Sequence, residues 1–228
     1  GESRSTAISP DRSMQGRFFV LEGLDGSGKT SVARRLADEL RELGRDVVET
    51  REPGGTWLGE QVRALLLDTA HHPLLPATEA LLFAAARAQH VGETIKPALE
   101  RGADVVCDRF ADSSLAYQWG GRGLDLEDLR AAQSLAIGDL EPDLKLLLDL
   151  PVEASLQRRR SSGEINRLDS EVVDFYERVR EAYLQLTVRD PDRWRIIDAS
   201  KSPAEVWQEV HRAVVSFDLP NERSRVSE

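Results

Sequence analysis

Hydrophobic residues occur along the chain in two spacings, short unbroken runs and longer stretches with a helical repeat. The short runs have the length and composition of buried strands and lie at 18–22, 46–50, 103–107, 144–150 and 194–197. The helical repeats lie between and after them, at 31–43, 78–101, 124–137, 152–160, 171–189 and from 202 onward. Because parallel strands are joined by crossover helices that cover their sheet, this order predicts an α/β fold, a five-stranded parallel sheet with helices on both faces.

Two of the expected helices carry clear end signals. Gly102 follows the longest helical repeat as its expected C-cap, and Pro97 predicts a kink within that repeat. The last helix is expected to begin with Ser202 as N-cap and Pro203 in the first helical position. Glu205 then completes a capping box with Ser202.

The length of the chain predicts a single domain. Of the 228 residues, 40% are hydrophobic and 31% are charged, which supplies apolar material for one core. We expect this domain to cover residues 16–217. Residues 1–15 are polar and lack the apolar stretch of a signal peptide, so we expect a disordered N-terminal arm, and residues 218–228 are expected to form a flexible tail.

Charge and cysteine content narrow the functional classes. The formal net charge is −10 at pH 7, which leaves no excess of positive charge for a polyanion, so we expect no nucleic-acid partner. No run approaches the roughly 18 apolar residues of a transmembrane helix, and we expect no membrane partner. The single cysteine, Cys107, excludes an intramolecular disulfide and fits a reducing cytosol, which predicts a cytoplasmic location.

The segment between the first expected strand and the first expected helix matches the phosphate-binding pattern G-x-x-x-x-G-K-[ST]. Its residues are Gly23, Leu24, Asp25, Gly26, Ser27, Gly28, Lys29 and Thr30. Glycines let backbone N–H groups turn inward around phosphate oxygens, and the helix N-terminus adds a partial charge of about +0.5. We expect Lys29 to reach the β- and γ-phosphates of ATP and the Thr30 hydroxyl to ligate Mg²⁺. The alternative is a glycine-rich turn that merely links strand to helix.

Two absent motifs limit the kind of nucleotide-dependent protein. The chain has no Asn-Lys-x-Asp motif, which GTPases use to recognise guanine. It also has no apolar run closed by Asp-Glu, which many ATP-driven motors carry. The remaining polar clusters must therefore indicate the phosphate acceptor.

Ligands of parallel sheets bind at the carboxyl ends of the strands, and polar residues of this chain gather there. Asp108 and Arg109 close the third expected strand and precede Phe110. We expect Asp108 to hold Mg²⁺ through water and Arg109 to clamp a phosphate with its guanidinium group, the alternative being a surface ion pair. Asp149, at the end of the fourth expected strand, is expected to be a turn or cap residue.

Two further segments are candidates for an acceptor pocket. The turn at 51–56 contains Glu52 and Pro53 and is either a plain turn or one wall of that pocket. Phe83 and Arg87 lie four residues apart and share one face of a helix. Taken alone, this pair predicts a core phenylalanine and a solvated arginine.

Hydroxyl side chains follow the third expected strand. Ser113, Ser114 and Tyr117, if helical, present their hydroxyls toward the same cleft. Helix capping by the serines and half-buried packing of the tyrosine are the alternatives.

A basic segment follows the fourth expected strand and is a local anomaly in an acidic chain. It contains Arg158, Arg159, Arg160 and Arg167. Such a run is commonly a solvated face. Phosphoryl transfer, however, is catalysed by positioning and by neutralising charge, which arginines closing over the γ-phosphate supply. We therefore expect a short, flexible, arginine-bearing lid at about 158–168.

In order and spacing, these segments resemble the bacterial thymidylate kinases from about residue 17 to residue 217. The resemblance is carried by 19–30, 50–56, 82–87, 108–110 and 113–118, extended by 120–123 and 158–167. It implies a P-loop kinase that transfers the γ-phosphate of ATP to dTMP, giving dTDP, with Mg²⁺ as cofactor. It also implies a homodimer and a cis peptide bond before Pro53.

The resemblance assigns roles to individual residues. Phe83 would stack on thymine and Arg87 would bond its edge, which reverses the prediction made from their spacing. Asp25 would face the sugar and phosphate of the acceptor. The implied dTMP-binding residues are Glu52, Pro53, Phe83, Arg87, Arg109, Ser113, Ser114 and Tyr117. The implied catalytic residues are Lys29, Asp25, Arg109, Arg158 and Arg160.

The resemblance also concerns the source of the transition-state arginine. Positions 25 and 27 are Asp and Ser, so no basic residue precedes Lys29 inside the loop, and the lid must supply the arginine. One departure is Ser162, where similar lids carry Arg just before Gly-Glu. This departure leaves open which arginine reaches the transferring phosphate, among Arg158, Arg159, Arg160 and Arg167.

Two rival functions remain. A deoxynucleoside kinase phosphorylates a hydroxyl and needs a carboxylate base; such enzymes tend to carry Glu-Arg-Ser where this chain has Asp108-Arg109-Phe110. A non-catalytic nucleotide sensor would only change partners on binding ATP. The complete set of Lys29, Thr30 and basic lid residues favours an enzyme.

Overall fold

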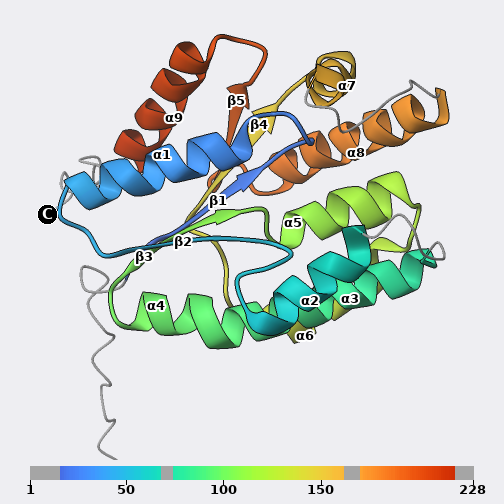
Figure 1. Cartoon of the computed structure of the whole chain (residues 1–228), viewed down its shortest axis with the longest axis horizontal. Helices are drawn as coiled ribbons and strands as arrows, with labels where there is room; N and C mark the ends of the chain where they lie inside the picture. Colours follow the sequence, from blue (N-terminus) through green and yellow to red (C-terminus); the bar gives the residue numbers. More distant parts are fainter. Residues whose placement is uncertain (1–15, 68–73, 162–169, 219–228) are drawn as a thin grey trace, which may run out of the picture.

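The five predicted strands form one parallel sheet. The computed structural model describes residues 16–67, 74–161 and 170–218 (Figure 1). The strands are β1 (Phe18–Glu22), β2 (Val47–Arg51), β3 (Asp104–Asp108), β4 (Leu144–Asp149) and β5 (Trp194–Asp198). Their order is β2-β3-β1-β4-β5, and every pairing is parallel. The predicted sheet is therefore confirmed, with strand ends shifted by one residue in most cases.

Helices connect all of these strands. They are α1 (Lys29–Glu42), α2 (Trp57–Leu67), α3 (Pro76–His90), α4 (Lys96–Glu100), α5 (Ala111–Ser114), α6 (Leu126–Ile137), α7 (Val152–Ser161), α8 (Ser170–Arg189) and α9 (Pro203–Asp218). Two π-helical segments, η2 (Val91–Ile95) and η3 (Leu115–Gly121), continue α3 and α5. The sequence did not predict α2. The predicted arm at 1–15 lies outside the described residues, as does the predicted tail after α9.

Alternate residues of the central strand face the two sides of the sheet. Phe19 and Leu21 pack into the core formed with α1 and α9, whereas Phe18 and Val20 pack against η2 and α4. Figure 1 shows α1 and α9 on one side of the sheet and α4 on the other. Helices therefore cover both faces, as the unbroken apolar strands predicted.

The long predicted helix at 78–101 is divided into three parts. Between α3 and α4, the chain widens into the π-helical segment η2, directly before Pro97. Proline has no N–H for the carbonyl four residues earlier, and a π turn is one way in which a helix accommodates this loss. Gly102 follows with a φ of 85°, and its N–H bonds to the Leu99 carbonyl at 3.0 Å, which confirms its predicted role at the helix end.

The predicted start of the last helix is also confirmed. The Ser202 backbone N–H donates to the Glu205 carboxylate at 3.0 Å, and the Glu205 N–H donates to the Ser202 hydroxyl at 3.4 Å. These reciprocal bonds form the capping box that begins α9. Across the described ranges, none of the helices is both long and apolar enough to span a bilayer.

Candidate active site

The predicted phosphate loop connects the end of β1 to the start of α1. Gly23 has a φ of 137°, and a Cβ atom there would lie 2.5 Å from the Leu148 carbonyl oxygen. Gly28 directly precedes α1 with a φ of 93°, in the left-handed region. Only glycine adopts such angles without strain, so the two glycines give the loop its tight curvature and leave backbone N–H groups free to turn toward an anion.

Lys29 lies inside the curve of this loop. Its Nζ donates to the Leu24 carbonyl at 2.7 Å and to the Ser27 hydroxyl at 3.4 Å, and only 6% of the residue is exposed. Burial, together with the nearby charge of Arg109, lowers the pKa of Lys29 to about 8. If a phosphate group took the place of the Leu24 carbonyl as the partner of Lys29, its negative charge would favour the protonated ammonium group.

Thr30 and Asp108, the two predicted Mg²⁺ ligands, lie in contact. The Thr30 hydroxyl donates to Asp108 Oδ2 at 2.5 Å. The other carboxylate oxygen, Oδ1, is buried and has no hydrogen-bond partner among the described residues. In that part of the chain, no cluster of three or more His, Cys, Asp or Glu side chains has metal-binding geometry. The hydroxyl of Thr30 and the unpartnered oxygen of Asp108 are oxygen ligands of the kind that Mg²⁺ takes, in small number, beside water and phosphate oxygens.

Arg109 connects the phosphate loop to the helix that follows β3. Its Nη1 donates to the Gly23 carbonyl at 3.0 Å, to Ser113 Oγ at 3.1 Å and to Tyr183 Oη at 3.2 Å. Its Nη2 donates to Asp25 Oδ1 at 2.5 Å. Although burial alone raises the pKa of Asp25, the charges of Arg109 and Lys29 outweigh it and lower this pKa to about 2. Asp25 is therefore an anion at neutral pH.

Glu22, the last residue of β1, is a buried carboxylate that the sequence analysis missed. It accepts bonds from the backbone N–H groups of Phe110 and Ser113 at 2.9 and 3.2 Å. It also accepts from the hydroxyls of Ser113 and Tyr183 at 2.5 and 3.0 Å. Burial, reinforced by the nearby charge of Asp112, raises the pKa of Glu22 to about 7. Glu22 thus anchors the turn that presents Arg109.

Arg87 is buried at the other end of the predicted acceptor pocket, with 1% of its surface exposed. Its Nε donates to Glu52 at 2.6 Å, its Nη1 to the hydroxyl of Ser114 at 3.1 Å and its Nη2 to the Phe110 carbonyl at 3.1 Å. Nη1 also donates to Gln133. The solvated arginine expected from spacing alone is wrong, because a carboxylate and three other acceptors offset the cost of burial.

Phe83 shares the face of α3 that carries Arg87. It is half-buried and packs into none of the buried core clusters of the described chain. The core phenylalanine expected from spacing is therefore not found. Four residues before Phe83, Glu79 accepts a bond at 2.9 Å from the side-chain amide of Gln118. Glu79, Phe83 and Arg87 form one row, with Ser114 and Gln118 bonded to its two ends.

Glu52 has a second partner besides Arg87. His90 Nδ1 lies 2.9 Å from Glu52 Oε1, and His90 Nε2 lies 2.7 Å from the hydroxyl of Thr50. A carboxylate only accepts, so Nδ1 carries a proton and donates to Glu52. The bond between Glu52 and Pro53 is cis. The turn is thus bonded through Glu52 to both Arg87 and His90 of α3, and its place in an acceptor pocket stays a prediction.

The side chains of Arg51 and Glu52, adjacent in this turn, bond to different partners. Arg51 points to Glu60 of α2, with an Nη2–Oε2 distance of 3.1 Å, and shares no bond with Glu52.

Asp149 is neither the turn nor the cap residue that was expected. Its carboxylate accepts two bonds, at 2.8 and 2.9 Å, from Arg180 and so ties β4 to α8.

Known proteins are similar to this chain in sequence and in fold. A family model described as thymidylate kinase matches residues 21–210. The chain belongs to the thymidylate kinase family. It is accordingly an enzyme, a nucleoside monophosphate kinase that acts on nucleotides.

Individual relatives match along most of the chain. A thymidylate kinase from Thermomicrobium roseum is 51% identical over 208 residues, which covers 91% of this chain and 98% of the relative. One from Ectopseudomonas mendocina is 48% identical over 204 residues, covering 90% and 97%. The crystal structure of thymidylate kinase from Ehrlichia chaffeensis superposes with a TM-score of 0.72 at 35% identity, covering 88% of this chain and 99% of that one.

The basic segment of this family member differs from the flexible lid that was predicted to start at residue 158. Residues up to Ser161 form the last turn of α7. Arg158 donates to the carbonyls of Gly26 at 3.2 Å and Ala199 at 3.0 Å. Arg159 donates to Tyr176 Oη at 2.5 Å. Helix formation continues because Leu156 and its neighbours are buried against the rest of the fold.

The other two predicted lid arginines are Arg160 and Arg167. Arg160 is exposed and has no hydrogen bond or ion pair with any described residue. Arg167 lies outside the described residues, as does most of the predicted lid. The lid therefore stays a prediction for the part of the segment after Ser161.

Arg63, on the unpredicted helix α2, is a further basic group beside the turn that contains Pro53. Its Nη1 donates to the Pro53 carbonyl at 3.1 Å. Burial, aided by the charge of Arg51, lowers the pKa of Arg63, while the nearby Asp108 acts in the opposite direction. Arg63 is thus held against the turn at Pro53, and no local motif in the sequence marks it.

Proposed function

We propose that this chain transfers the γ-phosphate of ATP to dTMP. The observation that carries this proposal is the position of Arg109. Its guanidinium group bonds both to Gly23 of the phosphate loop and to Ser113, a predicted dTMP-binding residue. The loop and Lys29 suit a nucleoside triphosphate, because their donors converge on one anionic ligand. Arg109 and Arg63 supply positive charge where a second nucleotide would bring its phosphate.

The base pocket suits the edge of thymine. Arg87 has one Nη2 hydrogen without a partner among the described residues, and the buried side-chain oxygen of Gln118 also has none. Thymine presents a carbonyl oxygen beside an N–H group, so it takes one donor and one acceptor, the kinds of group that Arg87 and Gln118 supply. Cytosine presents the opposite pattern. Phe83, half-buried and one helical turn before Arg87 on α3, offers its ring as a stacking surface.

Mg²⁺ is proposed as the cofactor, with Thr30 and Asp108 as its protein contacts. The unpartnered Asp108 Oδ1 and the adjacent hydroxyl are oxygen donors of the kind that this ion prefers. When bound, Mg²⁺ neutralises negative charge on the phosphates of ATP.

The chemistry proposed for these residues is direct in-line transfer without a covalent intermediate. The acceptor phosphate is ionised at neutral pH, so it needs no strong general base. Lys29 and Arg109 hold the two phosphate groups, and Asp25 fixes Arg109 between them. Of the predicted catalytic arginines Arg158 and Arg160, the second is the better candidate for the transferring phosphate, because carbonyl groups already hold Arg158.

Assembly as a homodimer is part of the proposal. Three adjacent helices, α2, α3 and α6, gather on one side of the molecule (Figure 1). They carry exposed leucines, Leu65 at 61%, Leu81 at 62% and Leu135 at 89%. A second copy would remove this apolar surface from water. Light scattering should give twice the 25.4 kDa chain mass, and a single-chain mass would contradict this point. The acidic chain with one buried cysteine also fits the proposed cytoplasmic location.

A coupled ADP-release assay tests the proposed reaction. With ATP and Mg²⁺, dTMP should be phosphorylated faster than dCMP, and thymidine should not react. Lys29→Ala should cut turnover at saturating ATP at least about a hundredfold, because Lys29 supports the charge that grows during transfer. Lys201→Ala, which removes an exposed lysine paired with Glu209, is the matched control. Faster turnover of thymidine, or no turnover of any monophosphate, would overturn the proposal.

A further inference from the structure

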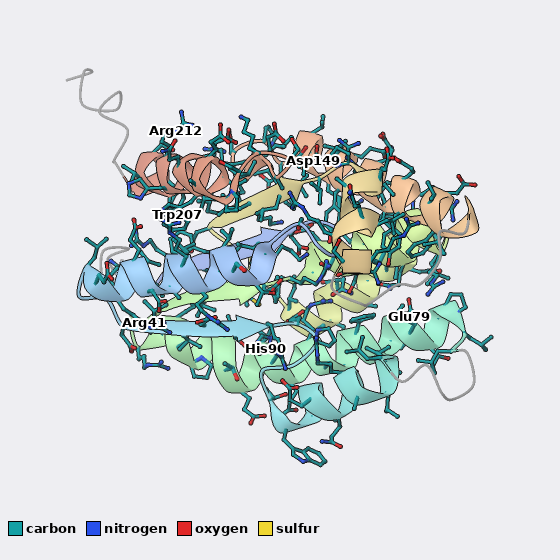
Figure 2. The ribbon with its side chains drawn as sticks, turned by 45° about the horizontal axis from the view of Figure 1, so that its top comes forward. Arg41, Glu79, His90, Asp149, Trp207 and Arg212 are labelled. Carbon is teal, nitrogen blue, oxygen red and sulfur yellow. The ribbon has the colours of Figure 1, made fainter. Side chains whose placement is uncertain are left out.

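Glu79 is held at the start of the row that it forms with Phe83 and Arg87 on α3. Its Oε1 accepts from Gln118 Nε2 at 2.9 Å, and its Oε2 accepts from Arg122 Nη2 at 3.2 Å. Its side chain is 18% exposed, whereas Gln118 is 1% exposed. Figure 2 labels Glu79 and His90 toward opposite ends of α3. Each end of α3 therefore has a buried or half-buried carboxylate, Glu52 beside His90 and Glu79 here.

The contact with Glu79 decides which end of the Gln118 amide is free. An ionised carboxylate has acceptor oxygens and no hydrogen to donate, so only the NH₂ end of an amide can bond to it. The Gln118 oxygen consequently points away from Glu79. That oxygen is buried without a hydrogen-bond partner among the described residues, which is rare in folded proteins and indicates a missing partner.

The position of Gln118 indicates what that partner is. Ser114 lies four residues earlier and receives a bond from Arg87, so the two cross-links join the same two helical segments. Phe83 lies midway between Glu79 and Arg87 on α3. Gln118 and Arg87 are thus bonded to the two ends of the stretch of α3 that carries Phe83, and under the proposed function the base of the acceptor would lie against this stretch.

We propose that Glu79 is a positioning residue for base selectivity. By holding the NH₂ end of Gln118, it makes this side chain an acceptor toward the pocket, and the site then favours a base with an N–H beside a carbonyl. The inference rests on the proposed use of dTMP. Without Glu79, the amide can turn over, and its NH₂ end would donate to the ring nitrogen of cytosine.

A structural role is the alternative to be separated. The ion pair of Glu79 with Arg122 also links α3 to the end of η3, and losing it could loosen the pocket as a whole. Arg122→Gln breaks this ion pair and leaves the Glu79 carboxylate on Gln118. Arg122 touches no residue assigned to phosphate transfer, so this variant is a matched control.

The main test measures the affinities of dTMP and dCMP by calorimetry with the full chain. In Glu79→Gln the side chain at 79 can donate or accept, so both orientations of the Gln118 amide become available. The Kd for dTMP should stay within about threefold, and the Kd for dCMP should fall at least about tenfold, since one mismatched hydrogen bond is relieved. Arg122→Gln should leave the ratio of the two values within about threefold.

A double exchange, Glu79→Gln with Gln118→Glu, provides the rescue. The amide at 79 then donates to the carboxylate at 118, whose other oxygen again faces the pocket as an acceptor, and the total charge is unchanged. The ratio of the two Kd values should return toward that of the unaltered chain. Three outcomes would each overturn the inference. They are a Kd ratio that does not change in Glu79→Gln, a Kd ratio that changes as much in Arg122→Gln as in Glu79→Gln, and a Kd ratio that does not recover in the double exchange. Failure of the unaltered chain to bind dTMP would instead refute the proposed function.

Discussion

The guanidinium group of Arg109 donates to the carboxylate of Asp25 over 2.5 Å, which joins the end of β3 to the phosphate loop. Arg109 is also the one non-glycine residue among those described with a positive φ, 73°. The backbone at the end of β3 is thus held in an unfavourable conformation, and this conformation turns the side chain toward the loop. Arg109 therefore sets both the position and the charge of the guanidinium group between the two proposed substrate sites.

Two substitutions separate the backbone of Arg109 from its charge. Arg109→Gly and Arg109→Ala both remove the guanidinium group, and both should raise the KM for dTMP at least about tenfold, far more than the KM for ATP. Glycine adopts a φ of 73° without strain, so Arg109→Gly should be more stable than Arg109→Ala by about 1 kcal/mol. Steady-state kinetics and urea unfolding measure the two effects. Equal changes in both KM values would contradict a role at the acceptor phosphate.

ATP affinity should fall with pH above 8. The pKa of Lys29 is lowered to about 8 by burial and by Arg109, so the free enzyme loses this proton above that pH. ATP binds best to the ammonium form and must restore the proton, which weakens binding by up to about tenfold per pH unit. Calorimetry between pH 7.5 and 9.5 measures this slope. Lys29→Arg, whose charge persists, should lack it, and a flat profile for the unaltered chain would refute the assignment.

The phosphate loop and the sheet could be predicted because their signals are local. An apolar run marks each strand, and glycines at fixed spacing mark the loop before Lys29. Helix α2 was missed because Trp57, Leu65 and Leu67 are exposed at 61% or more, which blurs the amphipathic pattern that identifies a helix.

Buried polar partners were beyond the sequence for a different reason. The Phe110 N–H that bonds to Glu22 lies 88 residues away, and Glu52 lies 35 residues from Arg87. A charged residue in isolation predicts a solvated side chain, since burial is stable only when a distant segment supplies the partner. Only the resemblance to a known family implied that Arg87 is not a solvated side chain.

Glu22 should make the free energy of unfolding depend on pH. Its pKa is raised from 4.5 to about 7 in the folded chain, by burial and by Asp112. Between these values the folded state holds the proton more tightly than the unfolded state, so stability falls as the pH rises from about 4.5 to 7. The expected loss is on the order of 3 kcal/mol. Below pH 4.5 both states are protonated, and Glu22 contributes no penalty.

Glu22→Gln removes the titrating group and nearly preserves its shape. Urea unfolding at pH 5 and pH 8 should show a smaller difference between the two pH values in this variant than in the unaltered chain. The comparison cancels the other titrating groups, which both proteins share. A difference that does not change with the substitution would show that Glu22 titrates near its ordinary value.

Glu52 should be far more important for stability than Glu60, although each pairs with an arginine. Glu52 and Arg87 are buried, with side chains 4% and 1% exposed, and Arg87 Nε lies 2.6 Å from Glu52 Oε2. Glu60 and Arg51 are 45% and 51% exposed. Glu52→Gln leaves the Arg87 charge buried without its counter-ion, which costs about 3–5 kcal/mol. Glu60→Gln breaks a pair that water and salt already screen, and should cost no more than about 1 kcal/mol.

Urea unfolding of both variants, with dTMP kinetics alongside, measures the contrast. Since Glu52 also fixes Arg87 at the base edge, Glu52→Gln should raise the KM for dTMP while the KM for ATP stays within about threefold. The Glu60→Gln control should change neither value appreciably. Similar losses of stability in the two variants would mean that the buried pair is offset by other contacts of Arg87, to Ser114 and to the Phe110 carbonyl, and that the carboxylate is not what holds it in place.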